Sequence, residues 1–140
     1  MDLTTAMDCV RDRRQGVLTT IRRDGRPQLS NVVYAVDDAG IIRISVTASR
    51  AKAKNLQRDP RGSLYVSRDD FWAYVVIDGE AEITPVAADP GDATVDELVE
   101  LYRSLAGEHD DWDDYRTSMV RDGRLVVRLT PNGAYGMLGS

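Results

Sequence analysis

Cysteine and histidine are almost absent from this sequence, with one of each in 140 residues. The single cysteine, Cys9, can form no internal disulfide and has no histidine near it in the sequence, so we expect a small packed residue of a first helix. The single histidine, His109, has no second histidine to join it, which argues against a zinc site or a Ser-His-Asp triad. The sequence therefore predicts no metal site, and it assigns no catalytic residue.

Long hydrophobic runs are also missing. No apolar run reaches the roughly 18 residues that a membrane span requires, and the charged residues between positions 8 and 14 do not fit a signal peptide. Neither a Gly-x-Gly-x-x-Gly after a predicted strand nor a P-loop is present, which argues against both nucleotide-binding folds. With 42% hydrophobic residues, the chain has apolar material for one core. We expect a single cytoplasmic domain, residues 1–140, without membrane association.

The net charge of −5 conceals two halves of opposite sign. Residues 1–68 hold 13 Lys and Arg against 7 Asp and Glu, whereas residues 69–140 hold 5 against 16. An acidic chain does not suit general nucleic-acid binding, and none is predicted. A local basic site within such a chain suits a small anionic ligand instead.

Lysine is scarce too, and its placement is informative. The only two lysines, Lys52 and Lys54, lie in the stretch 49–58, which holds four cations and no acid. Ser49 is a favourable helix N-cap, and Pro60 ends any helix that begins there, so the sequence predicts a short helix over residues 50–59.

The first turn of that helix would carry Arg50 and Lys52, where the helix dipole is already positive. A bound anion would reverse this unfavourable arrangement, because it could accept hydrogen bonds from the backbone, the Ser49 hydroxyl and both cations. We interpret the stretch as a phosphate-binding site. The alternative is a solvated basic face.

The remaining pattern predicts a β-rich chain with flanking helices. Alternating and β-branched runs indicate six strands of an antiparallel meander that closes into a barrel. The turn at Asp24-Gly25 joins the first two strands, and Asp78-Gly79 is a bulge or turn before a short edge strand. The predicted helices cover residues 4–14, 50–59, 94–106 and 112–122; the strands cover 16–22, 27–36, 41–47, 62–67, 71–77 and 80–84, with a last strand at 124–130 and a Gly-rich tail at 131–140.

Three polar residues, Gln28, Ser30 and Asn31, interrupt an otherwise apolar strand. Such groups must find hydrogen-bond partners when they are buried. They either bond to the next strand and to water, or hold the amide edge of a flat heterocycle.

Taken together, these segments resemble the pyridoxamine 5′-phosphate oxidase-like split barrels, and more closely their actinobacterial flavin/deazaflavin oxidoreductases of the B group, which use coenzyme F420. The resemblance covers roughly residues 9–136. It rests on the segments Gly16–Thr20, Asp24–Val32, Arg50–Arg61 and Ala106–Arg116.

The resemblance implies a homodimer of six-stranded antiparallel split barrels with two cofactor sites at the interface. By the same resemblance, Arg50 and Lys52 bind the cofactor phosphate, with Lys54 and Asn55 beside them. The ring system would contact Gln28, Ser30, Asn31 and Val32, the partner subunit would contribute Trp72 as a wall, and Arg58 and Arg61 would meet the anionic tail of F420.

The implied activity is hydride transfer between F420 and a small conjugated or quinone-like substrate. Alternatives are an FMN-dependent oxidoreductase or a non-enzymatic flavin- or haem-binding module, since one fold can host all three. The proton donor is left open between solvent and Tyr34. The segment Arg128–Gly136 lacks the histidine and tryptophan of the substrate motif in pyridoxamine phosphate oxidases, so vitamin B6 oxidation is not expected.

Overall fold

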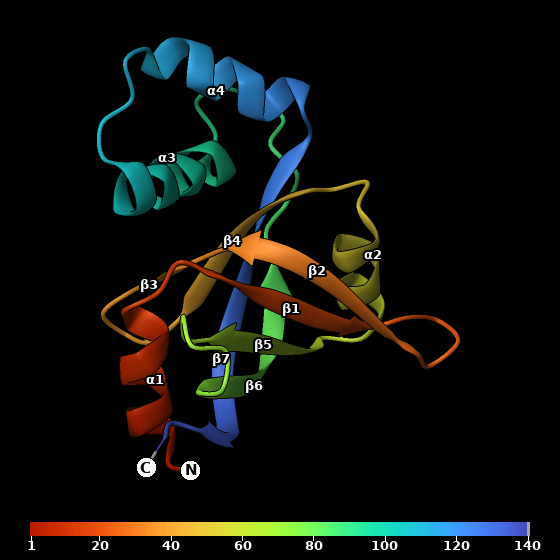
Figure 1. The fold of residues 1–140 in the computed structure, drawn as a ribbon. Helices are drawn as coiled ribbons and strands as arrows, with labels where there is room; N and C mark the ends of the chain where they lie inside the picture. The colour runs from red at the N-terminus through yellow and green to blue at the C-terminus, as the bar shows by residue number, and fades with distance from the viewer. Residues whose placement is uncertain (140) are drawn as a thin grey trace.

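A curled antiparallel sheet forms the body of the protein (Figure 1). In the computed structural model, which describes residues 1–139, its seven strands follow the order β2-β1-β5-β6-β7-β4-β3. The strands are β1 (Gln15–Ile21), β2 (Pro27–Val33), β3 (Ala35–Val36), β4 (Ile42–Thr47), β5 (Arg61–Ser67), β6 (Tyr74–Ile83) and β7 (Arg124–Met137); the helices are α1 (Leu3–Arg11), α2 (Ala51–Arg58), α3 (Ala93–Ala106) and α4 (Trp112–Arg121).

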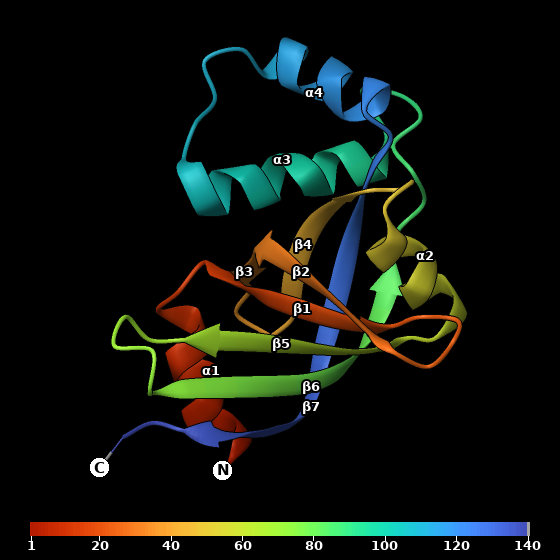
Figure 2. The same cartoon turned by 45° about the vertical axis from the view of Figure 1, so that its right-hand side comes forward.

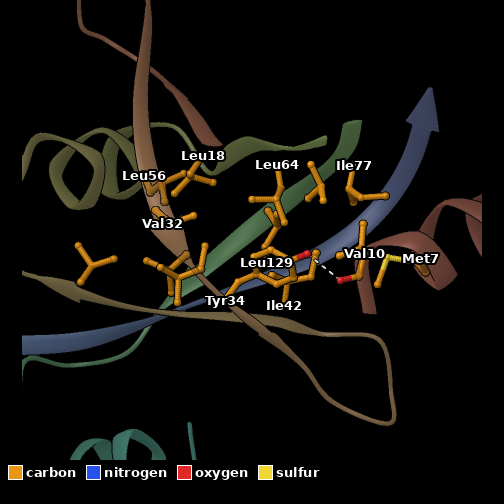
Figure 3. Packing of buried hydrophobic residues seen from close by; sticks show 14 of the residues in the cluster. Met7, Val10, Leu18, Val32, Tyr34, Ile42, Leu56, Leu64, Ile77 and Leu129 are labelled. Carbon is orange, nitrogen blue, oxygen red and sulfur yellow. Dashed lines mark hydrogen bonds between the residues drawn. The ribbon is translucent and has the colours of Figure 1, made fainter. Parts of the chain in front are cut away.

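Alternation of apolar and polar residues explains how the sheet curls around a core. In β4, Ile42, Ile44 and Val46 are buried and the residues between them are not. Figure 3 shows the core that such residues fill, with Tyr34 near its centre. The Tyr34 hydroxyl donates a 2.7 Å hydrogen bond to the carbonyl of Val10 on α1, and burial raises the pKa of this tyrosine. The bond satisfies a hydroxyl that would otherwise be costly to bury.

The prediction of a mainly β fold with flanking helices is confirmed, but the strand count of six is wrong. The strand predicted over residues 27–36 is divided into β2 and the short β3. Of the residues predicted as a separate edge strand, 80–84, the first four instead continue β6, whose residue Ala81 pairs with Leu129 of β7. The predicted irregularity at Asp78-Gly79 is confirmed as a bulge, and it lets one strand cover both segments.

The two ends of β6 and β7 also differ from the prediction. Residues 71–73, predicted as strand, lie in the loop before β6. The predicted Gly-rich tail from residue 131 extends β7 as far as Met137, which pairs with Tyr74. At Gly136, φ is 151° and a Cβ would lie 2.3 Å from the Tyr74 carbonyl oxygen, so this glycine is needed by close strand pairing.

Helices α3 and α4 cover the outer side of the β4–β7 region, and α1 lies at the opposite end of the sheet beside both termini (Figures 1 and 2). Val95, Leu98 and Val99 of α3 pack with Val126 of β7 in a second apolar cluster. Glu97 of α3 accepts hydrogen bonds from Arg43 of β4 at 3.0 Å and Arg128 of β7 at 2.8 Å, which fixes the helix on the sheet.

The two short helices follow the prediction with a correction at one end of each, since α1 ends at Arg11 and not at residue 14. Helix α1 buries Cys9, as predicted. Helix α2 begins later than expected, because Arg50 and not Ser49 is its N-cap residue, and no side chain caps it. Within residues 1–139, no helix is both long and apolar enough to cross a bilayer.

Candidate functional site

A groove with a volume of about 560 Å³ lies where β2 faces β4, beside the first turn of α2. We call it the basic groove. Its lining comes from β2, β4, α2, the end of α3 and the start of β7: Ser30, Asn31, Val32, Val33, Ile44, Ser45, Val46, Thr47, Arg50, Lys52, Leu105 and Arg124. The sheet is curled so that its edge strand β2 comes close to β4 although the two are not paired.

Three cations and no carboxylate belong to this lining, as far as the described residues go. Arg50 and Lys52 come from the beginning of α2, and Arg124 comes from β7. Burial, together with the nearby charges of Arg50 and Arg124, lowers the pKa of Lys52. Since α2 has no side-chain cap, its first N–H groups add further positive potential. The groove is therefore electrostatically suited to an anion.

A wider groove of about 930 Å³ continues from the basic groove. We call it the wide groove. The two share Asn31, Val32 and Val33 of β2 and Leu105 of α3, so they form one trough. The other lining residues are Asp12, Arg13, Arg14, Gln15, Gly16, Val17, Tyr65, Ser67, Arg68 and Asp69. The combined size of the basic groove and the wide groove suits a ligand with a flat ring at one end and an anionic group at the other.

The strand between the grooves is an edge strand, because β2 pairs only with β1. Backbone N–H and C=O groups on the free side of an edge strand can bond to a ligand. The side chain of Asn31 is exposed there, while Val32 is buried and supports the strand from within. A ring with an amide edge could therefore lie along β2 and be recognised by the backbone and by Asn31.

The end of α3 forms a wall common to both grooves. Arg14 donates a hydrogen bond from Nη1 to the carbonyl of Leu105, which links this helix end to the start of β1. Contacts between α3 and β4 hold the rest of the helix in place. The position of Leu105 is thus set by the sheet on two sides, which makes the trough a preformed feature of the fold.

Five of the ten sequence-predicted site residues come together in the basic groove: Ser30, Asn31, Val32, Arg50 and Lys52. The other five line neither groove: Gln28, Lys54, Asn55, Arg58 and Trp72.

The residues outside the grooves have other surroundings. Lys54 is exposed. Asn55 is buried and donates from Nδ2 to the Thr20 hydroxyl at 3.1 Å, and it accepts a 3.0 Å bond from Arg58, which also bonds to the carbonyl of Ile21. The side chain of Asn55 therefore joins α2 to β1.

The predicted tail-binding and wall residues also lie elsewhere. Arg61 is paired with Asp59 at 2.9 Å, away from both grooves. Gln28 is half-buried opposite Thr20 in the β1–β2 pair. Trp72 is 76% exposed in the loop before β6, where its ring and that of Phe71 form a T-shaped pair.

Sequence reasoning missed Arg124 and the hydroxyls of Ser45 and Thr47. The sequence places Arg124 far from residues 50–52, and only the pairing of β7 with β4, in which Arg124 lies opposite Thr47, brings it to the groove. The only available signal was a cation directly after the Asp122-Gly123 turn. Without knowledge of strand pairing, the sequence does not show that Arg124 lies beside residues 50–52.

Two other residues considered from the sequence lie outside the trough. Tyr34 belongs to the core, and its hydroxyl is already bonded to Val10. His109 stacks among Tyr102, Trp112 and Tyr115, with ring centroids 5.1–5.6 Å apart. No group of three or more potential metal ligands occurs in the described part of the chain.

Comparisons with known proteins agree with the fold. A conserved hypothetical protein of Mycobacterium tuberculosis is 28% identical, with a TM-score of 0.74 over 98% of this chain and 84% of its own. A structure named F420 reductase is 24% identical, with a TM-score of 0.68 over 91% of this chain and 94% of its own. HutZ, a haem storage protein from Vibrio cholerae, is 15% identical, with a TM-score of 0.68 over 96% and 93%.

The last two likenesses are below 25% identity and concern the fold alone. The family model for pyridoxamine 5′-phosphate oxidase matches residues 4–138. Because nearly the whole chain is matched, this protein belongs to the pyridoxamine 5′-phosphate oxidase family.

Proposed function

We propose that this protein is an F420-dependent oxidoreductase that transfers hydride between the deazaflavin and a small conjugated or quinone-like substrate. The observation that carries the proposal is the trough itself, in which the edge strand β2 and the cations Arg50 and Lys52 meet. A structural neighbour named F420 reductase supports it at the level of the fold.

The residues fit such a cofactor in two respects. The cluster of Arg50, Lys52 and Arg124 has no carboxylate among the described lining residues, so the phosphate of the cofactor would supply the missing negative charge. The stretch Asn31–Val33 would hold the ring, because it is common to both grooves and lies on an edge strand. The substrate would then approach through the wide groove.

The bound deazaflavin would supply the hydride chemistry, and the protein would supply orientation and charge. In this proposal, β2 fixes the plane of the ring and the α2 cations fix the phosphate, so the ring can present only one face to the wide groove. Leu105 lines both grooves, and its apolar side chain would limit water at their junction. Tyr34 keeps its proton in the bond to Val10, which leaves solvent in the wide groove as the proton source.

We also propose a homodimer whose interface includes the outer face of the sheet. Strand pairing places Asn31, Val17, Tyr65, Val76 and Tyr135 in one row across that face. Paired residues share a face of the sheet, so this row is a continuous, largely apolar strip. The strip begins at the trough, because Asn31, Val17 and Tyr65 also line the wide groove.

A second copy on this strip would complete each trough. It would also cover Tyr135, which is 53% exposed, and bring exposed Trp72 near the partner's groove. Sedimentation equilibrium of wild type and Tyr135→Arg tests this: we expect a dimer that the substitution dissociates. A monomeric wild type at micromolar concentration would contradict the proposal.

FMN is the second candidate cofactor, and one observation favours it. Arg58 and Arg61, predicted to meet the acidic tail of F420, are both engaged elsewhere and line neither groove. FMN has a phosphate but no such tail, so it would not need them. Haem is not proposed, because the only histidine is packed among aromatic rings outside the trough.

Parallel titration of the purified protein with F420 and FMN tests the choice. We expect tighter binding of F420 and, with the reduced cofactor, oxidation on addition of a small quinone. Tighter binding of FMN would replace F420 by FMN in the proposal. Binding of neither compound would remove both.

A further inference from the structure

Arg124 is a half-buried arginine at the start of β7, and it has no acidic partner within residues 1–139. It is the first residue of β7 and lies opposite Thr47, at the end of β4. Its Nε is buried and has no hydrogen-bond partner within residues 1–139, and its Nη1 has only a 3.5 Å contact with the Ser45 hydroxyl. A buried charged donor without an acceptor is unfavourable, and native structures rarely keep one without a reason.

The other arginines of these two strands show the usual solution. Arg43 of β4 and Arg128 of β7 lie opposite each other, and both donate hydrogen bonds to Glu97. Near Arg124 the neighbouring charges are cations instead, because Arg50 and Lys52 line the same groove. This repulsion between cations acts on Lys52, because burial and then the charges of Arg50 and Arg124 lower its pKa. The fold therefore retains three cations where each disfavours the others.

We propose that Arg124 is a third ligand of the anion in the basic groove, and that it binds a phosphate oxygen of the cofactor together with Arg50 and Lys52. A guanidinium can donate from its two Nη groups in parallel to two oxygens of one phosphate, which a lysine cannot do. The hydroxyls of Ser45 and Thr47, which line the groove beside it, are further donors. This assignment rests on the proposed function, since it names a residue of the same site.

The placement gives Arg124 a distinct task. Arg50 and Lys52 belong to α2 and its start, whereas Arg124 belongs to β7, where its pairing with Thr47 of β4 ties its backbone to the sheet. It would fix the phosphate relative to the sheet, and thereby fix the ring relative to β2. Replacing Arg124 should therefore lower the affinity for ligands that carry the phosphate and leave the affinity for the ring system alone unchanged.

The test compares Arg124→Gln with Arg121→Gln, an exposed arginine three positions earlier that lines neither groove. The probes are F420, the F420 ring-ribityl core without phosphate, FMN and riboflavin. We expect Arg124→Gln to weaken binding of the phosphorylated compound that wild type prefers by about tenfold or more, because a charge-assisted contact is lost. The affinity of Arg124→Gln for the phosphate-free counterpart of that compound should change by less than about twofold. Arg121→Gln should bind both compounds with wild-type affinity.

Thermal unfolding separates a binding role from a structural one. We expect the unliganded Arg124→Gln protein to melt at or above the wild-type temperature, because a buried donor without an acceptor and its repulsion with Arg50 and Lys52 are removed. The variant should also lose most of the rise in melting temperature that ligand gives to wild type. A lower melting temperature without ligand, with unchanged binding, would show a structural role and overturn the proposal.

The outcomes also separate this proposal from the proposed function. Preference of wild type for FMN, with a loss in Arg124→Gln for FMN but not for riboflavin, would end the F420 assignment and keep Arg124 as a phosphate ligand. Preference for F420, with Arg124→Gln binding it as wild type does, would keep the function and end this proposal. Binding of no probe, and of no inorganic phosphate by calorimetry, would end both.

Discussion

The two lysines of the chain offer a matched test of the basic groove. They are two positions apart on α2, but Lys52 lines the groove and Lys54 is exposed outside it. Replacing Lys52 by alanine removes one charge-assisted contact to the cofactor phosphate, worth about 1.5–3 kcal/mol. At about 1.4 kcal/mol per tenfold, this corresponds to a loss of affinity of about 10- to 150-fold. Replacing Lys54 should cost less than about twofold, as an exposed charge is screened.

The pH dependence of binding gives a second measure of the same lysine. Its pKa is lowered by burial and by two neighbouring arginines, so without ligand it loses its proton at a lower pH than an ordinary lysine. Only the charged form attracts phosphate, so affinity should fall as the pH rises through this lowered pKa. Lys52→Met should lack this fall. The same shift affects stability: folding without ligand is disfavoured below the lowered pKa, and the penalty disappears as the pH rises towards 10.5 and above.

The test is fluorescence or calorimetric titration with F420, which compares the affinities of wild type, Lys52→Ala and Lys54→Ala. The phosphate-free core of the cofactor serves as the control ligand, and its binding should not distinguish the variants. Equal losses for the two lysines, or a greater loss for Lys54→Ala, would refute the placement of the phosphate beside the first turn of α2.

Three further outcomes are expected. Tyr34→Phe should lower the free energy of unfolding in urea by about 0.5–1.5 kcal/mol, because the Val10 carbonyl loses one donor and keeps the backbone N–H of Arg13, with hydride transfer unchanged; loss of activity without loss of stability would restore Tyr34 as a proton donor. The hydrogen bond from Arg128 lowers the pKa of Glu97, so its contribution is present above the ordinary pKa of 4.5 and is lost as the pH falls through the lowered value. Glu97→Gln should therefore cost about 1–2 kcal/mol at neutral pH and flatten the acid side of the stability curve, and an unchanged acid side would contradict this reasoning. Trp72→Ala should change subunit stability by less than about 0.5 kcal/mol, since the residue is exposed, but weaken F420 binding in the dimer; unchanged binding would remove Trp72 from the site.

Much of the fold follows from local pattern. The apolar alternation of β4 and the bulge at Asp78-Gly79 were readable from the sequence and are confirmed. The end of β7 was not readable, because Pro131, Gly133 and Gly136 are typical of loops. In the structure, Gly136 is required because the Tyr74 carbonyl of the neighbouring strand lies too close for a side chain. This requirement comes from a contact with a distant residue, so the local sequence does not reveal it.

The candidate site was predictable where it depends on one helix. The concentration of cations at residues 50–54 indicated the basic groove, and helix geometry separates Lys52 from Lys54, since two positions on a helix differ by about 200°. Arg124 could not be predicted, because the pairing of β4 with β7 sets its place. The same holds for Arg58, whose bonds to Ile21 and Asn55 depend on how α2 packs against β1.

The route of the chain between β6 and β7 has a consequence for how this architecture can diversify. Ile83 and Val127 lie opposite each other in adjacent strands, and residues 84–123, with α3 and α4, leave and re-enter the sheet at nearly the same point. An insertion anchored this way can lengthen, shorten or change its sequence with little effect on strand pairing. Since its helix end supplies Leu105 to the trough, substrate range could evolve in this excursion while the anion-binding end stays as it is.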